Sequence, residues 1–318
     1  MRVLVTGATG FIGSAVLEQA ASDSNLILRG TVRRSLIKKM DDIEIISVGN
    51  QLPNINWSEA VNDVDVIVHT AARAHVINDA STDPLVEFRR VNVDGTLNLA
   101  RQAANAGVKR FIFLSSIGVN GRSNTKPFTE EDTPLPEQDY AISKLEAEMG
   151  LQEIALSSEM EIVIIRPPLV YGPNAPGNFG RLFKWMQKNI PLPFGAIRNK
   201  RSFIGLDNLV NFIITCVKHP SAANQVFLVS DDEDISTTEL LNSISSAFGK
   251  KARLLPINQK LLEFLLIRLG KKGLAQQLCG SLQVDISKAK NILNWTPPVS
   301  VDEGLRKTVE HLLESPSI

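Results

Sequence analysis

Val3-Leu4-Val5-Thr6-Gly7-Ala8-Thr9-Gly10-Phe11-Ile12-Gly13 is the stretch that decides the fold. A short apolar run, predicted as a β-strand, leads into glycines at positions 7, 10 and 13 and then into a helical pattern. Such a turn forms a cradle for phosphate, because glycine lets the backbone approach a pyrophosphate and the free N–H groups of a helix N-terminus favour its charge. The GxxGxxG spacing differs from the commonest GxGxxG fingerprint. The stretch predicts a dinucleotide-binding turn, which later motifs have to support.

The composition is that of an ordinary globular protein. Of the 318 residues, 43% are hydrophobic and 21% are charged, so the chain can bury a large core. The 34 basic and 34 acidic residues give a formal net charge of zero, and no broad affinity for nucleic acid or an anionic membrane is expected. Cys216 and Cys279 lie far apart in the sequence, which argues against a disulfide framework.

Targeting and metal-binding patterns are not expected either. The first predicted strand begins at the N-terminus, which leaves no place for a signal peptide. No apolar run approaches the ~20 residues of a membrane span. The four histidines, at positions 69, 75, 219 and 311, lack metal-ligand spacing. We therefore expect a cytoplasmic enzyme with no metal and no membrane span.

Residues 1–170 alternate short β-like runs with helical patterns, which predicts a parallel sheet built from βαβ units. The helical patterns cover Asn92–Ala106 and Tyr140–Ser157. After the first strand, further strands are predicted at Leu26–Val32, Ile43–Val48, Val64–His69, Arg110–Leu114 and Ile162–Arg166. The predicted fold is α/β, with a Rossmann-type doubly wound parallel sheet.

The chain then becomes rich in proline and glycine, which is typical of loops that carry substrate contacts. A strand-to-helix pattern follows at Phe203–Lys218, with Asp207 as the expected N-cap, and another strand is predicted at Gln225–Ser230. The acidic run Asp231–Asp234 is expected to form a solvated turn ahead of a capping box that begins at Ser236.

The C-terminal part contains one amphipathic segment, Lys260–Lys272, which reads KLLEFLLIRLGKK. Such a helix can lie on a membrane surface. Packing on its own domain is the favoured interpretation, because the segment is short and most of its faces are apolar. Overall we expect an NAD(P)-binding Rossmann domain of residues 1–166 plus 204–230, and a smaller C-terminal α/β lobe of residues 167–203 plus 231–318 that binds the substrate.

Tyr140 and Lys144 form a pattern with catalytic chemistry. Four residues apart on a predicted helix, they share one face, so the lysine ammonium would stabilise a phenolate and lower the tyrosine pKa from ~10. Tyr140 could then exchange a proton with a substrate alcohol while a nicotinamide exchanges a hydride with the same carbon. Ser116, at the end of a predicted strand, could hydrogen-bond the reacting oxygen.

These motifs together resemble the extended short-chain dehydrogenase/reductase family of nucleotide-sugar epimerases, dehydratases and reductases, over essentially the whole chain. The resemblance rests on TGATGFIG at 6–13, HTAA at 69–72, NVDGT at 92–96, FLSS at 113–116, YAISK at 140–144 and RPPLVYGP at 166–173. It implies a UDP-sugar substrate, a homodimer, and a catalytic triad of Ser116, Tyr140 and Lys144. It also implies that Gly7, Gly10, Phe11, Ile12 and Gly13 hold the pyrophosphate, and that Ala71, Ala72, Ser115, Tyr140, Lys144 and Pro167 lie at the ribose and nicotinamide.

The end of the second predicted strand bears on the choice of dinucleotide. Arg33 and Arg34 stand where an acidic residue would bind the ribose 2′-OH of NAD, and guanidinium groups can pair with a 2′-phosphate. The alternative is that both arginines are merely solvated. We expect NADP(H) to be favoured, with NAD(H) as the other possibility. Asn50 is expected at the adenine amino group, where many relatives carry aspartate.

The residues after Ser116 bear on the reaction. Family dehydratases carry an Asp-Glu pair there, and this chain has Ile117-Gly118, so a 4,6-dehydratase is not expected. Reversible C4 oxidation by an epimerase and net reduction of a 4-keto sugar remain. The segments Asn199–Asn208 and Cys279–Asp285 are similar to those of bacterial reductases that form UDP-N-acetylquinovosamine.

The leading prediction is therefore C4 reduction of a UDP-4-keto-6-deoxy-hexose, with an N-acetylated sugar preferred, for surface polysaccharide synthesis. A UDP-glucose or UDP-N-acetylglucosamine 4-epimerase is the alternative. A non-catalytic, cofactor-sensing module is less favoured, because such proteins usually lack the Tyr-Lys pair. The predicted substrate contacts are Ser116 at the sugar, Arg201 at the diphosphate, and Asn178, Leu192 and Phe194 at the diphosphate and uracil.

Overall fold

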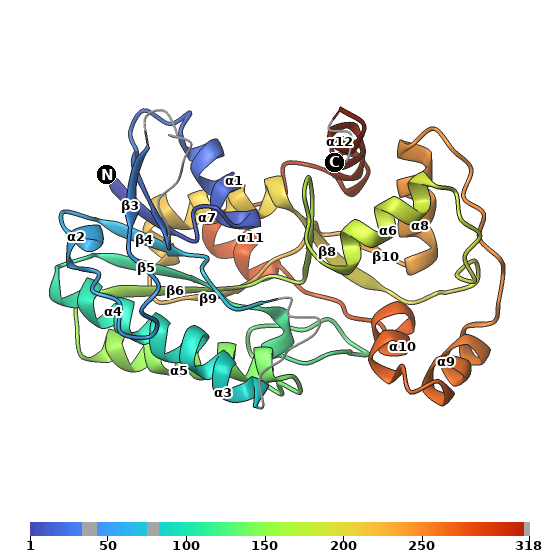
Figure 1. Cartoon of the computed structure of the whole chain (residues 1–318), viewed down its shortest axis with the longest axis horizontal. Helices are drawn as coiled ribbons and strands as arrows, with labels where there is room; N and C mark the ends of the chain where they lie inside the picture. Colours follow the sequence, from blue (N-terminus) through green and yellow to red (C-terminus); the bar gives the residue numbers. More distant parts are fainter. Residues whose placement is uncertain (34–42, 75–82, 315–318) are drawn as a thin grey trace.

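The computed structural model describes residues 1–33, 43–74 and 83–314 of the chain (Figure 1). Seven strands form a large parallel sheet in the order β3-β2-β1-β4-β5-β6-β9. Because the chain crosses over on both sides of β1, this is a doubly wound Rossmann sheet, and the predicted fold class is confirmed. The strands are β1 (Arg2–Thr6), β2 (Ile27–Val32), β3 (Glu44–Ser47), β4 (Val66–His69), β5 (Arg110–Leu114), β6 (Glu161–Arg166) and β9 (Val226–Leu228).

Helices cover both faces of the large sheet, because side chains along each strand alternate between two apolar clusters. On β1, Val3 and Val5 join one cluster and Leu4 joins the other. The first cluster includes side chains of α1 (Phe11–Ala20), α7 (Leu206–Lys218) and α11 (Ser287–Leu293). The second includes side chains of α2 (Ser58–Val61), α4 (Gly95–Asn105) and α5 (Asp139–Leu156).

A small three-stranded sheet, in the order β10-β8-β7, lies at one end of the large sheet (Figure 1). Its strands are β7 (Leu169–Tyr171), β8 (Arg201–Gly205) and β10 (Asp234–Ile235). A third apolar cluster forms around it, with side chains from α6 (Asn178–Gln187), α8 (Thr237–Ala247) and α12 (Val301–Glu314). The assignment of two domains with separate roles stays a prediction.

The helix predicted at Asn92–Ala106 begins earlier and is less regular than expected. α3 (Pro84–Phe88), a π-helical turn (Arg89–Asp94) and α4 follow one another without a break. Asp83 starts this run as its N-cap, since its carboxylate accepts a hydrogen bond from the Val86 N–H at 3.3 Å and a proline follows it directly.

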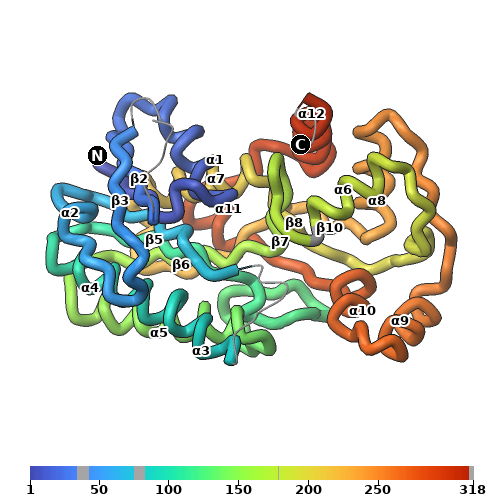
Figure 2. The backbone as a smooth tube through the Cα atoms, in the orientation of Figure 1, coloured from blue at the N-terminus to red at the C-terminus, as the bar shows by residue number. Residues whose placement is uncertain are grey.

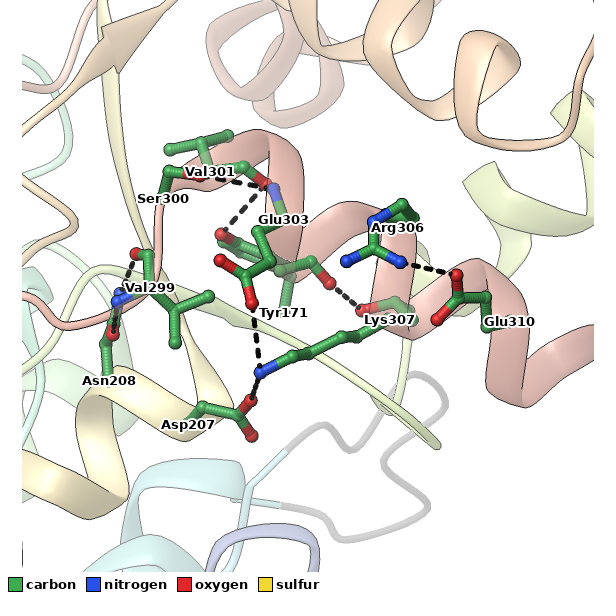
Figure 3. A network of polar contacts seen from close by, with 12 residues as sticks. Tyr171, Asp207, Asn208, Val299, Ser300, Val301, Glu303, Arg306, Lys307 and Glu310 are labelled. Carbon is green, nitrogen blue, oxygen red and sulfur yellow. Dashed lines mark hydrogen bonds and ion pairs between the residues drawn. The ribbon is translucent and has the colours of Figure 1, made fainter.

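Asp207 is not the N-cap of α7, contrary to the prediction. Gly205 occupies that position, and no side chain caps the helix. Asp207 lies in the first turn, where its charge favours the helix dipole, and it accepts a hydrogen bond from Lys307 Nζ at 3.1 Å (Figure 3). Glu303 of α12 lies 3.5 Å from the same ammonium. An ion pair between two helices thus takes the place of the predicted cap.

Asp231 is buried, although the sequence predicts a solvated turn across the acidic run. Its carboxylate accepts hydrogen bonds from the Tyr171 hydroxyl at 2.7 Å, the Gly205 N–H at 2.9 Å and the Asn208 amide at 2.7 Å. Burial raises the pKa of the Asp231 carboxyl above its ordinary value, while these donors act to lower it. We call these four residues the Asp231 cluster. It joins the end of β7, the start of α7 and the segment after β9.

The helices α9 (Gln259–Arg268) and α10 (Lys272–Cys279) form the end of the molecule farthest from the N-terminus (Figure 2). Leu262 of α9 is buried and Leu266 packs against the third apolar cluster. The favoured prediction, packing on the chain's own domain, therefore holds for one side of α9. Its other large apolar residues are exposed. Among the described helices, none is long and apolar enough to cross a membrane.

Candidate functional site

The glycine turn between β1 and α1 is too tightly packed to hold side chains. Gly7 has φ of +72°, a left-handed conformation that favours glycine. A Cβ on Gly13 would lie 2.2 Å from the Gly7 carbonyl oxygen, and a Cβ on Gly10 would lie 3.2 Å from the same atom. The Gly10 N–H donates to this carbonyl at 2.8 Å and closes the turn. The three predicted glycines thus bring β1 and the first turn of α1 into backbone contact.

The N-terminus of α1 presents hydrogen-bond donors. Phe11, Ile12 and Gly13 open the helix, and within the described ranges their main-chain N–H groups have no acceptor. The first turn contains no acidic residue, and its N-cap, Gly10, is exposed. Unpaired N–H groups at the positive end of a helix dipole bind phosphate. The residues present therefore fit the pyrophosphate of a dinucleotide.

The carboxyl end of β4 lies against this turn. Thr70 Oγ1 donates to the Thr6 carbonyl at 2.6 Å, and the Ala71 N–H lies 3.5 Å from the Thr6 hydroxyl. A Cβ on Gly7 would meet the Ala71 nitrogen at 3.0 Å. The structure thus brings Ala71 to the glycine turn, and Ala72 follows it on the surface.

His69 supports this edge of the sheet. Its ring is buried, with Nδ1 2.7 Å from Thr6 Oγ1 and Nε2 3.0 Å from Thr96 Oγ1. Burial, with a smaller contribution from the charge of Lys144, lowers the pKa of His69 to about 3. The imidazole is therefore neutral at neutral pH and engaged through both nitrogens, so it acts as a packing residue.

Ser116 caps a short 3₁₀ helix, Ile117–Val119, that follows β5. Its Oγ accepts a hydrogen bond from the Gly118 N–H at 3.1 Å, which leaves the hydroxyl proton free to donate to a substrate oxygen. Ile117 is buried in the core of the large sheet. This position therefore offers none of the acid–base groups of a dehydratase.

Tyr140 and Lys144 lie one turn apart in α5, beside the end of β5. The Lys144 ammonium is 5.9 Å from the centre of the Tyr140 ring and donates a hydrogen bond to the Leu114 carbonyl at 2.8 Å. Leu114 is the last residue of β5, two positions before Ser116. A Cβ on Gly118 would lie 3.2 Å from the Cβ of Ala141, the residue after Tyr140. The structure thus brings the three predicted catalytic residues to one corner.

The tyrosine pKa differs from the expectation. Burial raises the pKa of Tyr140 to about 12, and burial lowers the pKa of Lys144 to about 7 although the charge of Glu148 opposes this. The sequence predicts a lowered tyrosine pKa because of the neighbouring ammonium, and for the protein by itself this prediction is wrong. Lys144 is buried and Tyr140 is partly buried in this corner, and the loss of hydration favours the neutral form of each group.

A buried carboxylate that the sequence analysis missed supports this corner. Glu148 forms an ion pair with Arg166, with Oε2 and Nη2 2.6 Å apart and side chains only 2% and 6% exposed. Arg166 also donates to Asn120 Oδ1 at 3.0 Å. The Ser115 hydroxyl donates to Glu148, so this side chain, expected at the cofactor, points into the ion pair instead. The sequence offers one sign of this residue: Glu148 follows Lys144 by four positions on the predicted helix, which places both on the same face.

The residues expected at the adenosine half of the cofactor follow neighbouring strands. Arg33 comes directly after β2, which pairs with β1, and Asn50 lies shortly after β3. Both are exposed. Arg34 lies outside the described residues. The geometry leaves Arg33 accessible to a ligand on the adenosine side of the glycine turn.

The apolar residues expected at the uracil have a different role. Leu192 and Phe194 are only 7% and 8% exposed and belong to the third apolar cluster. Their side chains fill the core around the small sheet, which leaves little surface for a ligand. Asn178 is the first residue of α6, and its side chain lies outside what the structure describes.

Arg201 and Pro167 both lie at strand ends, and their roles at the diphosphate and the nicotinamide stay predictions. Arg201 begins β8, and its Nη1 donates to the Gly280 carbonyl at 3.0 Å. Burial lowers the pKa of its guanidinium. Pro167 follows β6, and its carbonyl accepts a hydrogen bond from the Ile117 N–H at 2.9 Å, so it lies next to Ser116.

A phenol, an ammonium and a hydroxyl beside a dinucleotide cradle can move a proton and a hydride at one alcohol carbon, which is the chemistry of the short-chain dehydrogenase/reductase class. Sequence comparison agrees with this reading of the site, since residues 3–230 match the NAD dependent epimerase/dehydratase family. The chain belongs to this family and is an NAD-dependent enzyme.

Several relatives match nearly the whole chain. A UDP-glucose 4-epimerase from Vibrio cholerae is 44% identical over 98% of this chain and 96% of its own. An N-acetyl-alpha-D-glucosaminyl-diphospho-ditrans,octacis-undecaprenol 4-epimerase from Escherichia coli O157:H7 is 28% identical over 97% of this chain and 94% of its own. The solved structure of a UDP-glucuronic acid 4-epimerase from Bacillus cereus, in complex with NAD, matches with a TM-score of 0.80 and 23% identity over 99% of both chains. This last likeness concerns the fold.

Proposed function

We propose that this enzyme is a 4-epimerase of a UDP-hexose. The observation that carries the proposal is the 44% identity, over 98% of the chain, to a UDP-glucose 4-epimerase. Epimerisation thereby replaces reduction of a 4-keto sugar as the leading interpretation. Reduction stays the rival, because the similarity of Asn199–Asn208 and Cys279–Asp285 to reductases favours it.

The catalytic residues divide the work at C4 of the sugar. The Ser116 hydroxyl would donate a hydrogen bond to the C4 oxygen. Burial keeps Tyr140 protonated in the protein by itself, whereas the positive charge of a bound nicotinamide would favour the phenolate that takes the C4 hydroxyl proton as the C4–H bond breaks. The ammonium of Lys144 stabilises the phenolate. The glycine turn of Gly7, Gly10 and Gly13 would hold NAD, which would accept the C4 hydride and give it back. Tyr140 would then return its proton to the C4 oxygen, so that C4 would be inverted without net electron transfer.

We further propose that residues 167–203 plus 231–318 bind the nucleotide sugar, with Arg201 at its diphosphate. Arg201 is partly buried, and none of the described carboxylates forms an ion pair with its guanidinium. Partial burial of a cation without a counter-charge has a desolvation cost. A diphosphate would supply that charge and accept the remaining guanidinium hydrogen bonds.

The test of the proposed function offers the purified enzyme three substrates in parallel: UDP-glucose, UDP-N-acetylglucosamine and a UDP-4-keto-6-deoxy-hexose. We expect interconversion of gluco and galacto sugars without added reductant, followed by NMR of the sugar. Stoichiometric consumption of reduced nicotinamide with the keto sugar, and no interconversion, would assign reduction instead.

A lipid-linked sugar is a second candidate substrate. The name of the E. coli relative describes a 4-epimerase of a sugar joined through a diphosphate to undecaprenol. The exposed apolar side of α9 favours this candidate, because a long isoprenoid needs an enzyme that works at a membrane surface. The same NMR assay, run with the polyprenyl diphosphate sugar in detergent, tests it.

Use of NADP(H) remains a proposal that rests on Arg33. If this guanidinium pairs with a 2′-phosphate, Arg33→Asp should weaken NADP(H) binding by about 1.5–3 kcal/mol, roughly tenfold to a hundredfold, with little loss for NAD(H). Fluorescence titration of both dinucleotides measures this. Arg101→Asp, at an exposed position on α4, is the control and should change neither affinity. Equal affinities of the unmodified protein for the two dinucleotides would contradict the proposal.

A further inference from the structure

One side of α9 is apolar and exposed. Leu261, Phe264 and Leu265 are each about half exposed, at 51%, 53% and 47%. Their spacing of three and four positions places them on one helix face, turned away from the side on which Leu262 and Leu266 pack against the third apolar cluster. Ile267 and Leu269 add exposed apolar surface at the end of the helix, at 53% and 70%. A helix face exposed to water is normally polar, so this exposed apolar face indicates a surface that contacts another partner.

Basic residues precede, interrupt and follow the apolar segment of α9 in the sequence. Between Lys250 and Lys272 the chain has seven lysine and arginine residues and one acidic residue, Glu263. None of the seven forms an ion pair with a described carboxylate. The Arg268 guanidinium lies 5.3 Å from the centre of the Phe264 ring, so positive charge and apolar surface share one face. Because the formal net charge of the chain is zero, the remainder carries a matching negative excess, and the molecule is electrically polarised towards this end.

We propose that the α9–α10 face docks the enzyme onto an anionic membrane surface as a peripheral protein. We define the α9–α10 face as the exposed residues Leu261, Phe264, Leu265, Ile267, Leu269 and their basic neighbours Lys260, Arg268, Lys271 and Lys272. Apolar side chains enter the boundary between headgroups and acyl chains, while lysine and arginine remain among anionic headgroups. The negative remainder of the molecule would be repelled by the same surface, which fixes the orientation.

A second copy of the chain is the other occupant that an apolar face suggests. In a two-fold dimer the same patch meets itself. Such a dimer would bring the basic residues of both copies together with a single Glu263 on each side to offset them. The charge pattern therefore favours an anionic lipid surface over self-association.

The experiment measures co-flotation of the full-length enzyme with lipid vesicles, with no substrate present. Vesicles of phosphatidylcholine alone are compared with vesicles that also contain phosphatidylglycerol, each at low and high salt. We expect binding to the anionic vesicles, weakened by salt because screening reduces the attraction of the basic residues. Since the assay needs no turnover, its result is independent of the proposed epimerase activity.

Two variants and two controls locate the surface. The double variant Phe264→Glu with Leu265→Glu should reduce partition into vesicles about tenfold or more, since it removes two large apolar side chains from the contact. Leu156→Glu changes a side chain that is 90% exposed at the end of α5 and should bind as the unmodified protein does. Lys271→Glu with Lys272→Glu should weaken binding to anionic vesicles, and Arg101→Glu on α4 should not. Circular dichroism confirms that each variant is folded.

Three results would overturn the proposal. The first is an unmodified protein that does not float with anionic vesicles. The second is equal binding of the Phe264→Glu, Leu265→Glu variant and the Leu156→Glu control. The third is a dimer in analytical ultracentrifugation that the α9 variant converts to a monomer, which would assign the face to a second copy of the chain.

Discussion

Tyr140→Phe is expected to lower the turnover number about 10²- to 10⁴-fold while leaving cofactor affinity nearly unchanged. The hydroxyl exchanges the proton at C4, whereas the glycine turn holds the dinucleotide, so the two properties should separate. The remaining ring keeps its edge-on contact with Phe88, with centroids 6.1 Å apart, and the fold should be preserved. Rate assays beside a cofactor titration measure both effects. A variant with a near-normal rate would refute the assignment of Tyr140.

The chain offers a matched control, because it contains only two tyrosines. Tyr171→Phe removes the other hydroxyl, which donates to buried Asp231 at 2.7 Å. We expect this variant to lose about 1–3 kcal/mol of unfolding free energy, because a buried acceptor loses a donor, and to keep its turnover per folded molecule. Urea denaturation and the same rate assay make the comparison. If both variants lose stability and rate alike, the Tyr140 effect is structural.

Glu148→Gln is expected to destabilise the protein by about 3–5 kcal/mol, because it leaves the Arg166 guanidinium buried without its counter-charge. Glu146→Gln is the control on the same helix. Glu146 pairs with Arg89 at the surface, where both side chains are partly exposed, and removing that pair should cost about 0–1 kcal/mol. Thermal or urea unfolding of the two variants should therefore differ clearly. Equal stability would show that the buried ion pair contributes nothing.

The same substitution should shift the pH dependence of the rate. Burial lowers the pKa of Lys144 to about 7, and the negative charge of Glu148 acts in the opposite direction. Removing that charge lowers the Lys144 pKa further, so the ammonium is lost at a lower pH. The alkaline limb of the pH–rate profile should therefore move to lower pH in Glu148→Gln and stay in place in Glu146→Gln. An unchanged alkaline limb in Glu148→Gln would contradict this role for Glu148.

The sequence predicts the large sheet well, because most of its strands are short apolar runs that are buried along nearly their whole length, with β3 at the edge as the exception. β5 has the predicted bounds, Arg110–Leu114. The predicted capping box is confirmed, with Ser236 and Glu239 bonded to one another's backbone at the start of α8. The glycine turn and the Tyr140–Lys144 spacing are likewise local patterns. Each depends on neighbours within a few positions, and such patterns can be read without knowing the tertiary structure.

The misjudged residues depend on distant partners. In the sequence Asp231 is one of a run of acidic residues that is expected to be solvated. In the structure it is buried, and the three groups that donate hydrogen bonds to its carboxylate lie 60, 26 and 23 positions away in the sequence. The carboxylate of Glu148 meets Arg166, which comes from another element, 18 positions later. Leu192 and Phe194 lie in a proline-rich stretch that resembles a binding loop, but their side chains are buried in the core around the small sheet. Long-range packing decides all of these positions.

The Asp231 cluster has a consequence for attempts to graft a new sugar specificity onto this scaffold. Tyr171 ends β7 of the small sheet, whereas Gly205 and Asp231 lie in two passages between the sheets, the first from β8 into α7 and the second from β9 to β10. A transplanted segment that brings only one of these passages from another enzyme would leave the buried carboxylate short of a donor. Segments should therefore be exchanged at junctions that keep all four residues of the cluster from the same parent enzyme. The buried carboxylate then keeps every one of its hydrogen-bond donors.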